Sequence, residues 1–355
     1  MTCALLCGVL ASCKEKPMGV DEIYRNDASG VVLIMNRYYY AMSVAGTMVY
    51  FTGIDEDGNL ENLTDDVGEI TRNSAVAFGT GFFISRDGNI LTNRHVVRPE
   101  IDKTVVRTVL AKQLGRIKNL FAALRDAAEE QYNQTYYQGI YSGMVDDGRL
   151  EDLRESFEEY DETVGKIENI DLSDIRITTS SRVGIAYNGD NVSSPGDFSE
   201  CTVTKVSGVD DVDLAVIRLN SKKTPKGRYI FHFQSSTKGK RTQLETYWQR
   251  MRRDYKGRKL KAGTQLCMIG FNHGPQLAQT SKGLKSQITA GNILQDPDDD
   301  RMMYSIPLLE GSSGSPVLNM YGDVVGVNFA KLQGTTSFNF GIPAKKAKEF
   351  LGIGE

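Results

Sequence analysis

The sequence has few cysteines, no clustered histidines, no long apolar run and little net charge, and each of these features argues against a class of protein. Five cysteines in 355 residues, three of them within the first 13, exclude a disulfide-stabilised scaffold. The three histidines lie far apart in the sequence, and none belongs to a His/Cys cluster with the spacing of a metal site. No apolar run approaches the ~20 residues that span a bilayer. A formal net charge of −3 favours neither a polyanion nor a membrane surface as the partner of the whole chain.

What is present is the composition of an ordinary globular protein, with 40% hydrophobic and 25% charged residues. Cys201 and Cys267 lie within apparent strands, where we expect two separate buried thiols rather than a disulfide. We expect neither a metal nor a cofactor.

A serine between glycines leads into an apolar strand at residues 310–317, which read EGSSGSPV. Gly311 and Gly314 leave room for a substrate carbonyl and allow the backbone to direct two N–H groups at one point. A nucleophile at the end of a strand is presented in this way. Since glycine- and serine-rich turns also occur for purely structural reasons, the interpretation depends on agreement with other stretches.

Two further stretches agree with it. Residues 79–97 (GTGFFISRDGNILTNRHVV) predict two strands joined by a tight turn, with His95 at the end of the second strand. Residues 211–219 (DVDLAVIRL) predict an apolar strand with Asp213 at its start. Asp211 is two residues earlier and would point to the same side of a strand, so either aspartate could be the acidic partner of His95.

Together the three stretches resemble the motifs of trypsin-like serine peptidases of the chymotrypsin fold, and especially the peptidase domain of bacterial HtrA-type proteins. The turn is similar to the family's GxSGxP signature, the strand pair to its GSGFII and ILTNxHVV motifs, and the third stretch to its DLAVL strand. Histidine, aspartate and serine follow one another in the chymotrypsin order. The resemblance implies a catalytic triad of His95, Asp213 and Ser313, because the family's D-L-A pattern favours Asp213 over Asp211.

The resemblance also implies an oxyanion hole and a substrate pocket. The hole would consist of the N–H groups of Gly311 and Ser313. The pocket would be lined by residues before the nucleophile and on the strand after it, namely Pro307, Leu308, Asn328, Phe329 and Ala330. None of these offers a carboxylate to a basic side chain, so we expect a shallow apolar pocket and cleavage after small or medium aliphatic residues. Ser315 departs from the second glycine of GNSGG, but glutamyl endopeptidases of this fold carry GNSGSP.

The implied fold is all-β, with two six-stranded antiparallel β-barrels of the chymotrypsin type and a helical hairpin inserted in the first barrel. We expect the N-terminal barrel at residues 29–220, and the C-terminal barrel with a closing helix at 263–355. The resemblance itself covers about residues 29–97, 182–220 and 263–352. HtrA-type proteins usually carry a C-terminal PDZ domain, and we expect none here.

The helical insertion is predicted at about residues 103–170, where apolar residues recur three or four positions apart. Two stripes have this spacing: Val106, Leu110, Leu114, Ile117, Phe121 and Leu124 in the first, and Leu150, Leu153, Phe157, Tyr160, Val164 and Ile167 in the second. We expect an antiparallel hairpin that is packed on itself or on the barrel. It should behave as an appendage, because its two stripes can satisfy each other.

A second insertion, strongly basic, is expected between the barrels at residues 221–262. Residues 222–261 hold fourteen basic side chains against two acidic ones, whereas residues 146–174 hold twelve acidic side chains against three basic ones. Solvated faces are the first interpretation of both segments. Alternatively the two segments pair on the surface, or the basic one binds anionic lipid or nucleic acid, although it contains no recognisable nucleic-acid module.

The first residues are predicted to be a signal segment with a tether, at residues 1–28. Leu10-Ala-Ser-Cys13 resembles the bacterial lipobox, which implies lipidation of Cys13 and anchoring to a membrane. No Lys or Arg precedes the apolar run, which departs from a secretory n-region. The alternative is an N-terminal tail in a cytoplasmic protein.

The sequence therefore predicts a serine endopeptidase that acts through an acyl-enzyme on unfolded or extended polypeptides in the cell envelope, as a periplasmic or outer-membrane-attached lipoprotein. His95 would serve as base for the weakly nucleophilic Ser313 hydroxyl, and Asp213 would orient the histidine ring. Two alternatives stay open: a non-catalytic, protease-like binding or adaptor protein of the envelope, and an RNA- or lipid-binding adaptor that uses residues 222–261. Nucleic acid is not the expected partner, and no oligomeric state is predicted.

Overall fold

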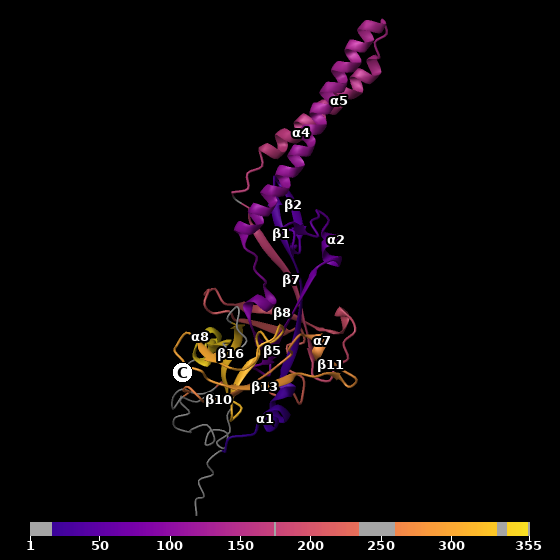
Figure 1. The fold of residues 1–355 in the computed structure, drawn as a ribbon. Helices are drawn as coiled ribbons and strands as arrows, with labels where there is room; N and C mark the ends of the chain where they lie inside the picture. Colours follow the sequence, from indigo (N-terminus) through magenta and orange to yellow (C-terminus); the bar gives the residue numbers. More distant parts are fainter. Residues whose placement is uncertain (1–15, 174, 234–259, 332–338, 354–355) are drawn as a thin grey trace, which may run out of the picture. The chain divides into compact units, whose positions relative to one another are not determined.

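The computed structural model describes residues 16–173, 175–233, 260–331 and 339–353, apart from the side chains of 330 and 331. The chain forms two compact units, which we describe separately. The first is drawn from residues 1–36, 76–98 and 182–355, and the second from residues 37–75 and 99–181. Figure 1 shows the chain with its helices and strands labelled.

The first barrel is a sheet that closes on itself. Its strands follow the order β1, β5, β6, β9, β8 and β7, and β7 pairs in turn with β1. Their bounds are Val31–Val44, Ala75–Phe83, Asn89–Thr92, Ala215–Leu219, Ser199–Val206 and Ile177–Tyr187. Phe82 of β5 lies opposite Leu91 of β6 in an antiparallel pair, as predicted for the two strands before His95.

Alternate residues of these strands fill the barrel. Val32 and Ile34 of β1, Phe83 of β5 and Ile90 of β6 pack in one cluster and have no solvent-exposed surface. Because successive side chains of a strand point to opposite faces, a spacing of two brings one face of each strand into the interior. Each side chain of this size contributes about 1.5–3 kcal/mol when it is fully buried.

The second barrel has six strands in the order β13, β10, β15, β16, β17 and β14. Their bounds are Gln287–Asn292, Gln265–Gly270, Pro316–Asn319, Val324–Lys331, Asn339–Pro343 and Met302–Tyr304. Ile293, which follows β13, forms a bridge with Tyr304 of β14, so the two ends of the sheet curl towards each other. The predicted pair of six-stranded antiparallel barrels is therefore confirmed.

Within the first unit, the two barrels share a hydrophobic cluster. It contains Phe82 and Leu214 from the first barrel and Ile269, Phe271 and Val327 from the second, all fully buried. Burial of both faces in one cluster holds the loops at the ends of β5, β6, β10 and β15 beside one another. The candidate site is built from these loops.

Short elements connect the strands of this unit. They are α1 (Val20–Asp27), η1 (Ala28–Gly30), α3 (Arg94–Val97), η2 (Pro195–Asp197), α7 (Pro275–Ala278), β11 (Gln279–Thr280), β12 (Gly283–Leu284) and α8 (Ala344–Leu351). Helix α8 follows Pro343 and occupies the residues predicted for the closing helix. Both described cysteines are free thiols, as expected, with Cys267 buried and Cys201 half-buried.

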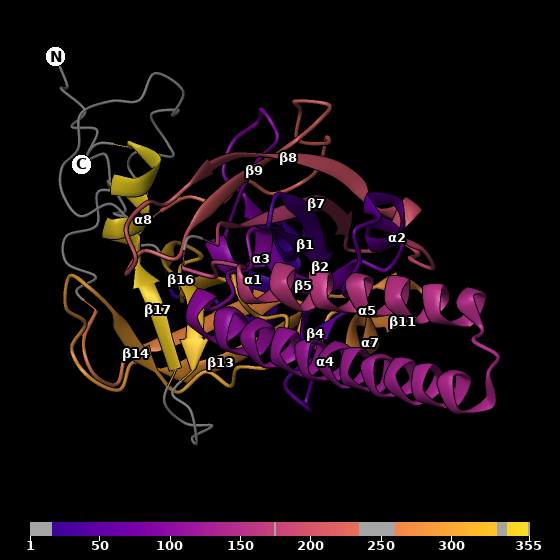
Figure 2. The same cartoon turned by 90° about the horizontal axis from the view of Figure 1, so that it is seen from above.

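The second unit consists of the outer parts of β1 and β7, a few short elements and two long helices. The short elements are β2 (Thr47–Phe51), β3 (Gly53–Ile54), β4 (Leu60–Glu61) and α2 (Val67–Arg72). The long helices are α4 (Lys103–Ser142) and α5 (Asp147–Glu168). Figures 1 and 2 show them side by side, so the predicted helical hairpin is confirmed. Within the described ranges no helix is both long and apolar enough to cross a membrane.

The ends of the hairpin helices have the expected capping chemistry. The Asp102 carboxylate accepts hydrogen bonds from the N–H groups of Thr104 and Val105 at the start of α4, and Asp146 accepts one from Arg149 at the start of α5. These bonds satisfy N–H groups that have no partner inside the helix.

The first turns of α4 pack on strands rather than on α5. Val106 packs with Tyr40 of β1 and Phe51 of β2 in a separate cluster. Only farther along do the helices meet, with the rings of Phe121 and Tyr160 6.0 Å apart. Apolar spacing identifies the buried face of a helix but not the element that covers it.

Candidate active site

His95 and Asp213 meet because β6 and β9 are antiparallel neighbours. Thr92, the last residue of β6, lies opposite Ala215, the first residue of β9, so the residues just beyond them are close. His95 Nδ1 is 2.5 Å from Asp213 Oδ2, and the His95 backbone N–H donates to Asp213 Oδ1 at 3.0 Å. Asn93 Nδ2 donates to the Asp213 carbonyl at 2.7 Å and fixes the loop that carries the aspartate.

The surroundings of Asp213 favour its ionised form. Burial acts to raise the pKa of this carboxyl, but the hydrogen bonds from His95 and the charge of Arg94 outweigh it and lower the pKa below its ordinary value. A carboxylate can only accept hydrogen bonds, so the proton of the contact lies on His95 Nδ1, and in the neutral ring Nε2 is then the acceptor. Asp211 is exposed, and among the described residues it forms no hydrogen bond or ion pair with His95.

The turn before β15 requires glycine at two positions. Gly311 has φ +86° and Gly314 has φ +85°, a region that residues with a side chain rarely adopt. A Cβ on Gly314 would lie 2.2 Å from the Thr80 carbonyl oxygen and 3.1 Å from the Asn93 nitrogen. The turn that carries Ser313 is therefore packed directly against the strand end that leads to His95.

Four successive carbonyl groups of this turn accept hydrogen bonds. The Glu310 carbonyl accepts from His273 N at 2.5 Å, and the Gly311 carbonyl accepts from Thr80 Oγ1 at 2.8 Å. The Ser312 carbonyl accepts from Asn328 Nδ2 at 2.9 Å, and the Ser313 carbonyl accepts from Thr80 N at 2.8 Å. The backbone of this turn, which carries the predicted nucleophile Ser313 and is called the nucleophile turn below, is thus held at every residue from 310 to 313.

These bonds determine where two N–H groups point. In a trans peptide the C=O and N–H bonds point in opposite directions, so anchoring the Glu310 and Ser312 carbonyls turns the Gly311 and Ser313 N–H groups the other way. In the described part of the chain neither N–H donates a hydrogen bond. Two unpaired donors beside the Ser313 side chain are what stabilisation of an oxyanion requires.

Of the three residues predicted to form the triad, the structure joins His95 and Asp213 directly and leaves the link to Ser313 open. The half-buried Ser313 hydroxyl forms no hydrogen bond with His95 or with any other described residue. Such bonds are often long in unliganded sites and tighten when a substrate is bound.

The residues predicted to line the substrate pocket have different surroundings. Pro307 is exposed, Leu308 is half-buried against the core of the second barrel, and Phe329 is half-buried against the shared cluster. Ala330 pairs with Phe340 through its backbone, and its side chain lies outside the described residues. Asn328 is 1% exposed and its amide bonds to the nucleophile turn.

Ser315, the residue that departs from the glycine motif, is fully buried. A Cβ on Gly270 would lie 2.2 Å from Ser315 Oγ, so glycine at 270 makes the space that the extra side chain occupies. The Ser315 hydroxyl has no partner among the described residues. The serine is therefore accommodated inside the second barrel beside the turn.

Sequence reasoning missed the residues that hold the turn: Thr80, His273 and Tyr304. Thr80 had a local signal, because it is a hydroxyl between two glycines in an otherwise apolar strand. Tyr304 and His273 had none, since their partners lie far away in the sequence.

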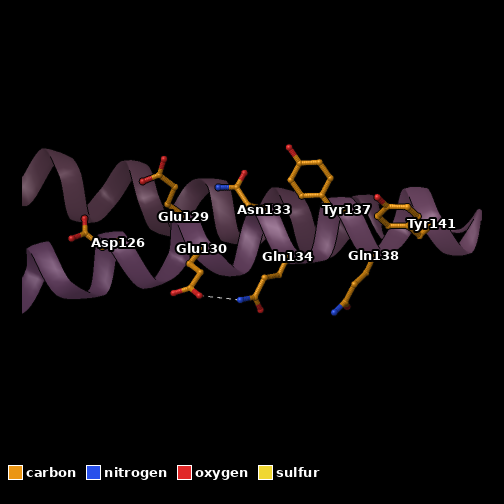
Figure 3. A pocket seen from close by; sticks show the side chains of 8 residues that line it. All are labelled: Asp126, Glu129, Glu130, Asn133, Gln134, Tyr137, Gln138 and Tyr141. Atoms are coloured by element: carbon orange, nitrogen blue, oxygen red, sulfur yellow. Dashed lines mark hydrogen bonds between the residues drawn. The ribbon is translucent and has the colours of Figure 1, made fainter.

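Other candidate sites provide no comparable arrangement. Within the described ranges no three His, Cys, Asp or Glu side chains gather as a metal site would need. Figure 3 shows a hollow on α4, which is lined by Asp126, Glu129, Glu130, Asn133, Gln134, Tyr137, Gln138 and Tyr141. No base is paired with a nucleophile among these lining residues. Cys13 and most of the basic stretch 222–261 lie outside the described residues.

Comparison with known proteins supports a relationship to peptidases. Residues 187–327, which include Asp213 and Ser313, match the family model described as "Trypsin-like peptidase domain". Human serine protease HTRA4 is 31% identical over 94 residues, which are 26% of this chain and 19% of that protein. The bovine serine protease HTR4 is 31% identical over 99 residues, covering 27% and 20% of the two chains. The chain thus spans about a fifth of the length of these curated relatives.

Among solved structures, the serine endoprotease from Yersinia pestis aligns with 95% of this chain and 67% of its own, at 14% identity and a TM-score of 0.44. The resemblance to trypsin-like peptidases that the sequence motifs predicted is confirmed by the family model.

Proposed function

We propose that this chain is a serine endopeptidase that hydrolyses peptide bonds through an acyl-enzyme on Ser313. The observation that carries the proposal is the 2.5 Å contact of His95 Nδ1 with Asp213 Oδ2, together with a turn whose Gly311 and Ser313 N–H groups have no partner in the part of the chain that the structure describes. His95 would be the base, Asp213 the orienting carboxylate, Ser313 the nucleophile, and the two N–H groups the oxyanion donors.

The reaction follows from this geometry. His95 Nε2 takes the proton of Ser313 Oγ as the oxygen attacks the substrate carbonyl, and Asp213 stabilises the imidazolium that forms. The negative oxygen of the tetrahedral intermediate accepts hydrogen bonds from the Gly311 and Ser313 N–H groups. Loss of one such donor costs about 3–4 kcal/mol in other enzymes. His95 returns its proton to the leaving amine, and water then releases the acyl group by the same route.

The substrate class is an extended or unfolded polypeptide with a small or medium aliphatic residue before the scissile bond. Leu308 and Phe329 are half-buried apolar side chains, one before and one after Ser313 in the sequence. Neither residues 306–309 nor residues 327–330 include an aspartate or a glutamate. Location in the cell envelope, with membrane anchoring through lipidated Cys13, belongs to the same proposal and rests on the lipobox-like sequence.

Labelling with a fluorophosphonate probe tests the proposal. The wild type should be labelled at Ser313, whereas Ser313→Ala and His95→Ala should not be. Ser313→Cys is a matched control, since it keeps a nucleophile of similar size and should react with thiol probes if the site is accessible. Equal labelling of Ser313→Ala, or an unlabelled wild type, would overturn it.

The absence of a Ser313–His95 hydrogen bond among the described residues favours a second candidate, a non-catalytic binding or adaptor protein. Such a protein would bind an unfolded polypeptide equally well as wild type and as Ser313→Ala. It would neither cleave the polypeptide nor react with the fluorophosphonate. A binding assay run beside the labelling experiment separates the two candidates.

A further inference from the structure

We propose that Tyr304, a buried residue outside the triad, is a positioning residue that keeps the oxyanion hole formed by holding Asn328 against the Ser312 carbonyl. The proposal rests on the proposed function, because it assigns a role within the same site. Its basis is a chain of short, buried hydrogen bonds between β14, β16 and the nucleophile turn.

The first link joins Tyr304 to Asn328. Tyr304 has no exposed surface, and its hydroxyl lies 2.7 Å from Asn328 Oδ1 and 3.0 Å from the Phe340 carbonyl. A phenol has one proton to donate, and the shorter contact takes it. Tyr304 therefore orients the Asn328 amide.

The second link joins Asn328 to the turn. Asn328 Nδ2 donates to the Ser312 carbonyl at 2.9 Å and lies 3.3 Å from Ser312 Oγ. A carbonyl can only accept, so the amide nitrogen must face Ser312 and the amide oxygen must face Tyr304. Both ends of the amide are thereby assigned by their partners.

The backbone of β16 reinforces this arrangement. Asn328 N donates to the Ser315 carbonyl and the Asn328 carbonyl accepts from Gly314 N, both at 2.9 Å. The register of β16 against β17 shifts between Asn328 and Ala330, an irregularity of the kind that re-aims a side chain. Asn328 thus contacts the turn through its main chain and its side chain at once.

The consequence for the site is the orientation of one peptide. With the Ser312 carbonyl held, the Ser313 N–H points to the opposite side, where the oxyanion forms. Without the Tyr304 hydroxyl, Asn328 Oδ1 would be buried with no partner and the amide could turn. The Ser312 carbonyl also accepts from Ser315 N at 3.1 Å, so the peptide would be loosened rather than released.

The test uses Tyr304→Phe, which removes only the hydroxyl, with Tyr24→Phe as the matched control. The Tyr24 hydroxyl also donates a 2.7 Å hydrogen bond, to the Ser286 carbonyl, but it does not contact the nucleophile turn. Asn328→Ala is the second variant and removes the amide itself. We would measure kcat per fluorophosphonate-titrated site and KM on two peptides, with Val or Ala before the scissile bond, together with the affinity for a peptide boronic acid.

Tyr304→Phe should lower kcat about ten- to a hundredfold on both peptides, less than the roughly 10²- to 10³-fold that follows loss of a whole oxyanion donor. KM should stay unchanged, and boronic acid affinity should fall by a similar factor. Asn328→Ala should show the same pattern more strongly, and Tyr24→Phe should match the wild type in all three quantities.

If the wild type is active, three results would overturn the role of Tyr304 and leave the proposed function intact. They are an unchanged kcat in Tyr304→Phe, an equal loss of kcat in Tyr24→Phe, or a changed preference between the two peptides. The last would make Asn328 a residue of the substrate pocket. A wild type that neither cleaves nor labels would overturn the proposed function, and the positioning role with it.

Discussion

Replacing Thr80 with valine should weaken both the fold and the reaction, because one hydroxyl links the first barrel to the nucleophile turn. Thr80 is fully buried in β5. Its Oγ1 donates to the Gly311 carbonyl at 2.8 Å and accepts from Phe271 N at 2.9 Å. Valine has nearly the same shape but no hydroxyl, so a carbonyl and an N–H would be left buried without partners.

The magnitude follows from those two groups. A buried polar group that loses its partner costs roughly 1–3 kcal/mol, so the free energy of unfolding should fall by about 2–5 kcal/mol. The backbone bond from Thr80 N to the Ser313 carbonyl survives the substitution, which limits the catalytic effect. We expect kcat to fall about tenfold, the effect of a loosened rather than a missing oxyanion donor.

Urea denaturation gives the first quantity, and peptide cleavage normalised to fluorophosphonate-titrated sites gives the second. Thr80→Ser is the matched control, because it keeps the hydroxyl and loses only a methyl group. If Thr80→Val proved as stable and as active as Thr80→Ser, the bonds through Oγ1 would not be what holds the turn.

Three further predictions concern other parts of the chain. Asp213→Asn should lower kcat about 10⁴-fold, because an amide presents the wrong partner to the histidine ring; a loss below tenfold in a cleavage assay would point to another orienting group. Replacing residues 119–166 of the hairpin with a short Gly/Ser turn should leave fluorophosphonate labelling of Ser313 unchanged, because the α4 residues that pack on the strands lie before this range. Loss of soluble protein would contradict this prediction. Burial, and to a smaller extent the charge of the Asp323 carboxylate, raises the pKa of Asp27 from 3.8 to about 7. The folded state then keeps a proton that the unfolded chain releases, so stability should fall as pH rises from about 4 to 7. Asp27→Asn should remove this slope and add up to about 4 kcal/mol at pH 8 in denaturant titrations; parallel pH profiles of the two proteins would refute it.

The elements that sequence reasoning located are those with a local signal. The strand pair before His95 has alternating apolar residues and a turn, and the hairpin helices have apolar residues three or four apart. The apolar run VVLI at residues 31–34 predicts only the start of strand β1, which continues to Val44. Residues 35–44 contain three successive tyrosines and no clean alternation, so their partners, rather than their pattern, make them a strand.

The candidate site likewise contains residues that a local motif reveals and residues that it does not. Each residue of the proposed triad lies in a short motif that could be read from the chain alone. The groups that hold the turn act through contacts between distant segments: 231 residues separate Thr80 from Gly311, and 24 separate Tyr304 from Asn328. No local pattern encodes such pairings, and only the packing of the two barrels brings them together.

That division has a consequence for how the proposed peptidase depends on its fold. Thr80, from the first barrel, holds the Gly311 and Ser313 carbonyls, while Asn328, from the second, holds the Ser312 carbonyl between them. The backbone of the whole turn, on which the oxyanion donors lie, is therefore held from both barrels and depends on their packing on the shared cluster. Because these bonds lie at the junction, a small separation of the barrels would release the turn while each barrel kept its own core. Reactivity of Ser313 should then be lost at lower denaturant concentration than the strands themselves, and coincident loss of both would show that the junction and the barrels unfold as one.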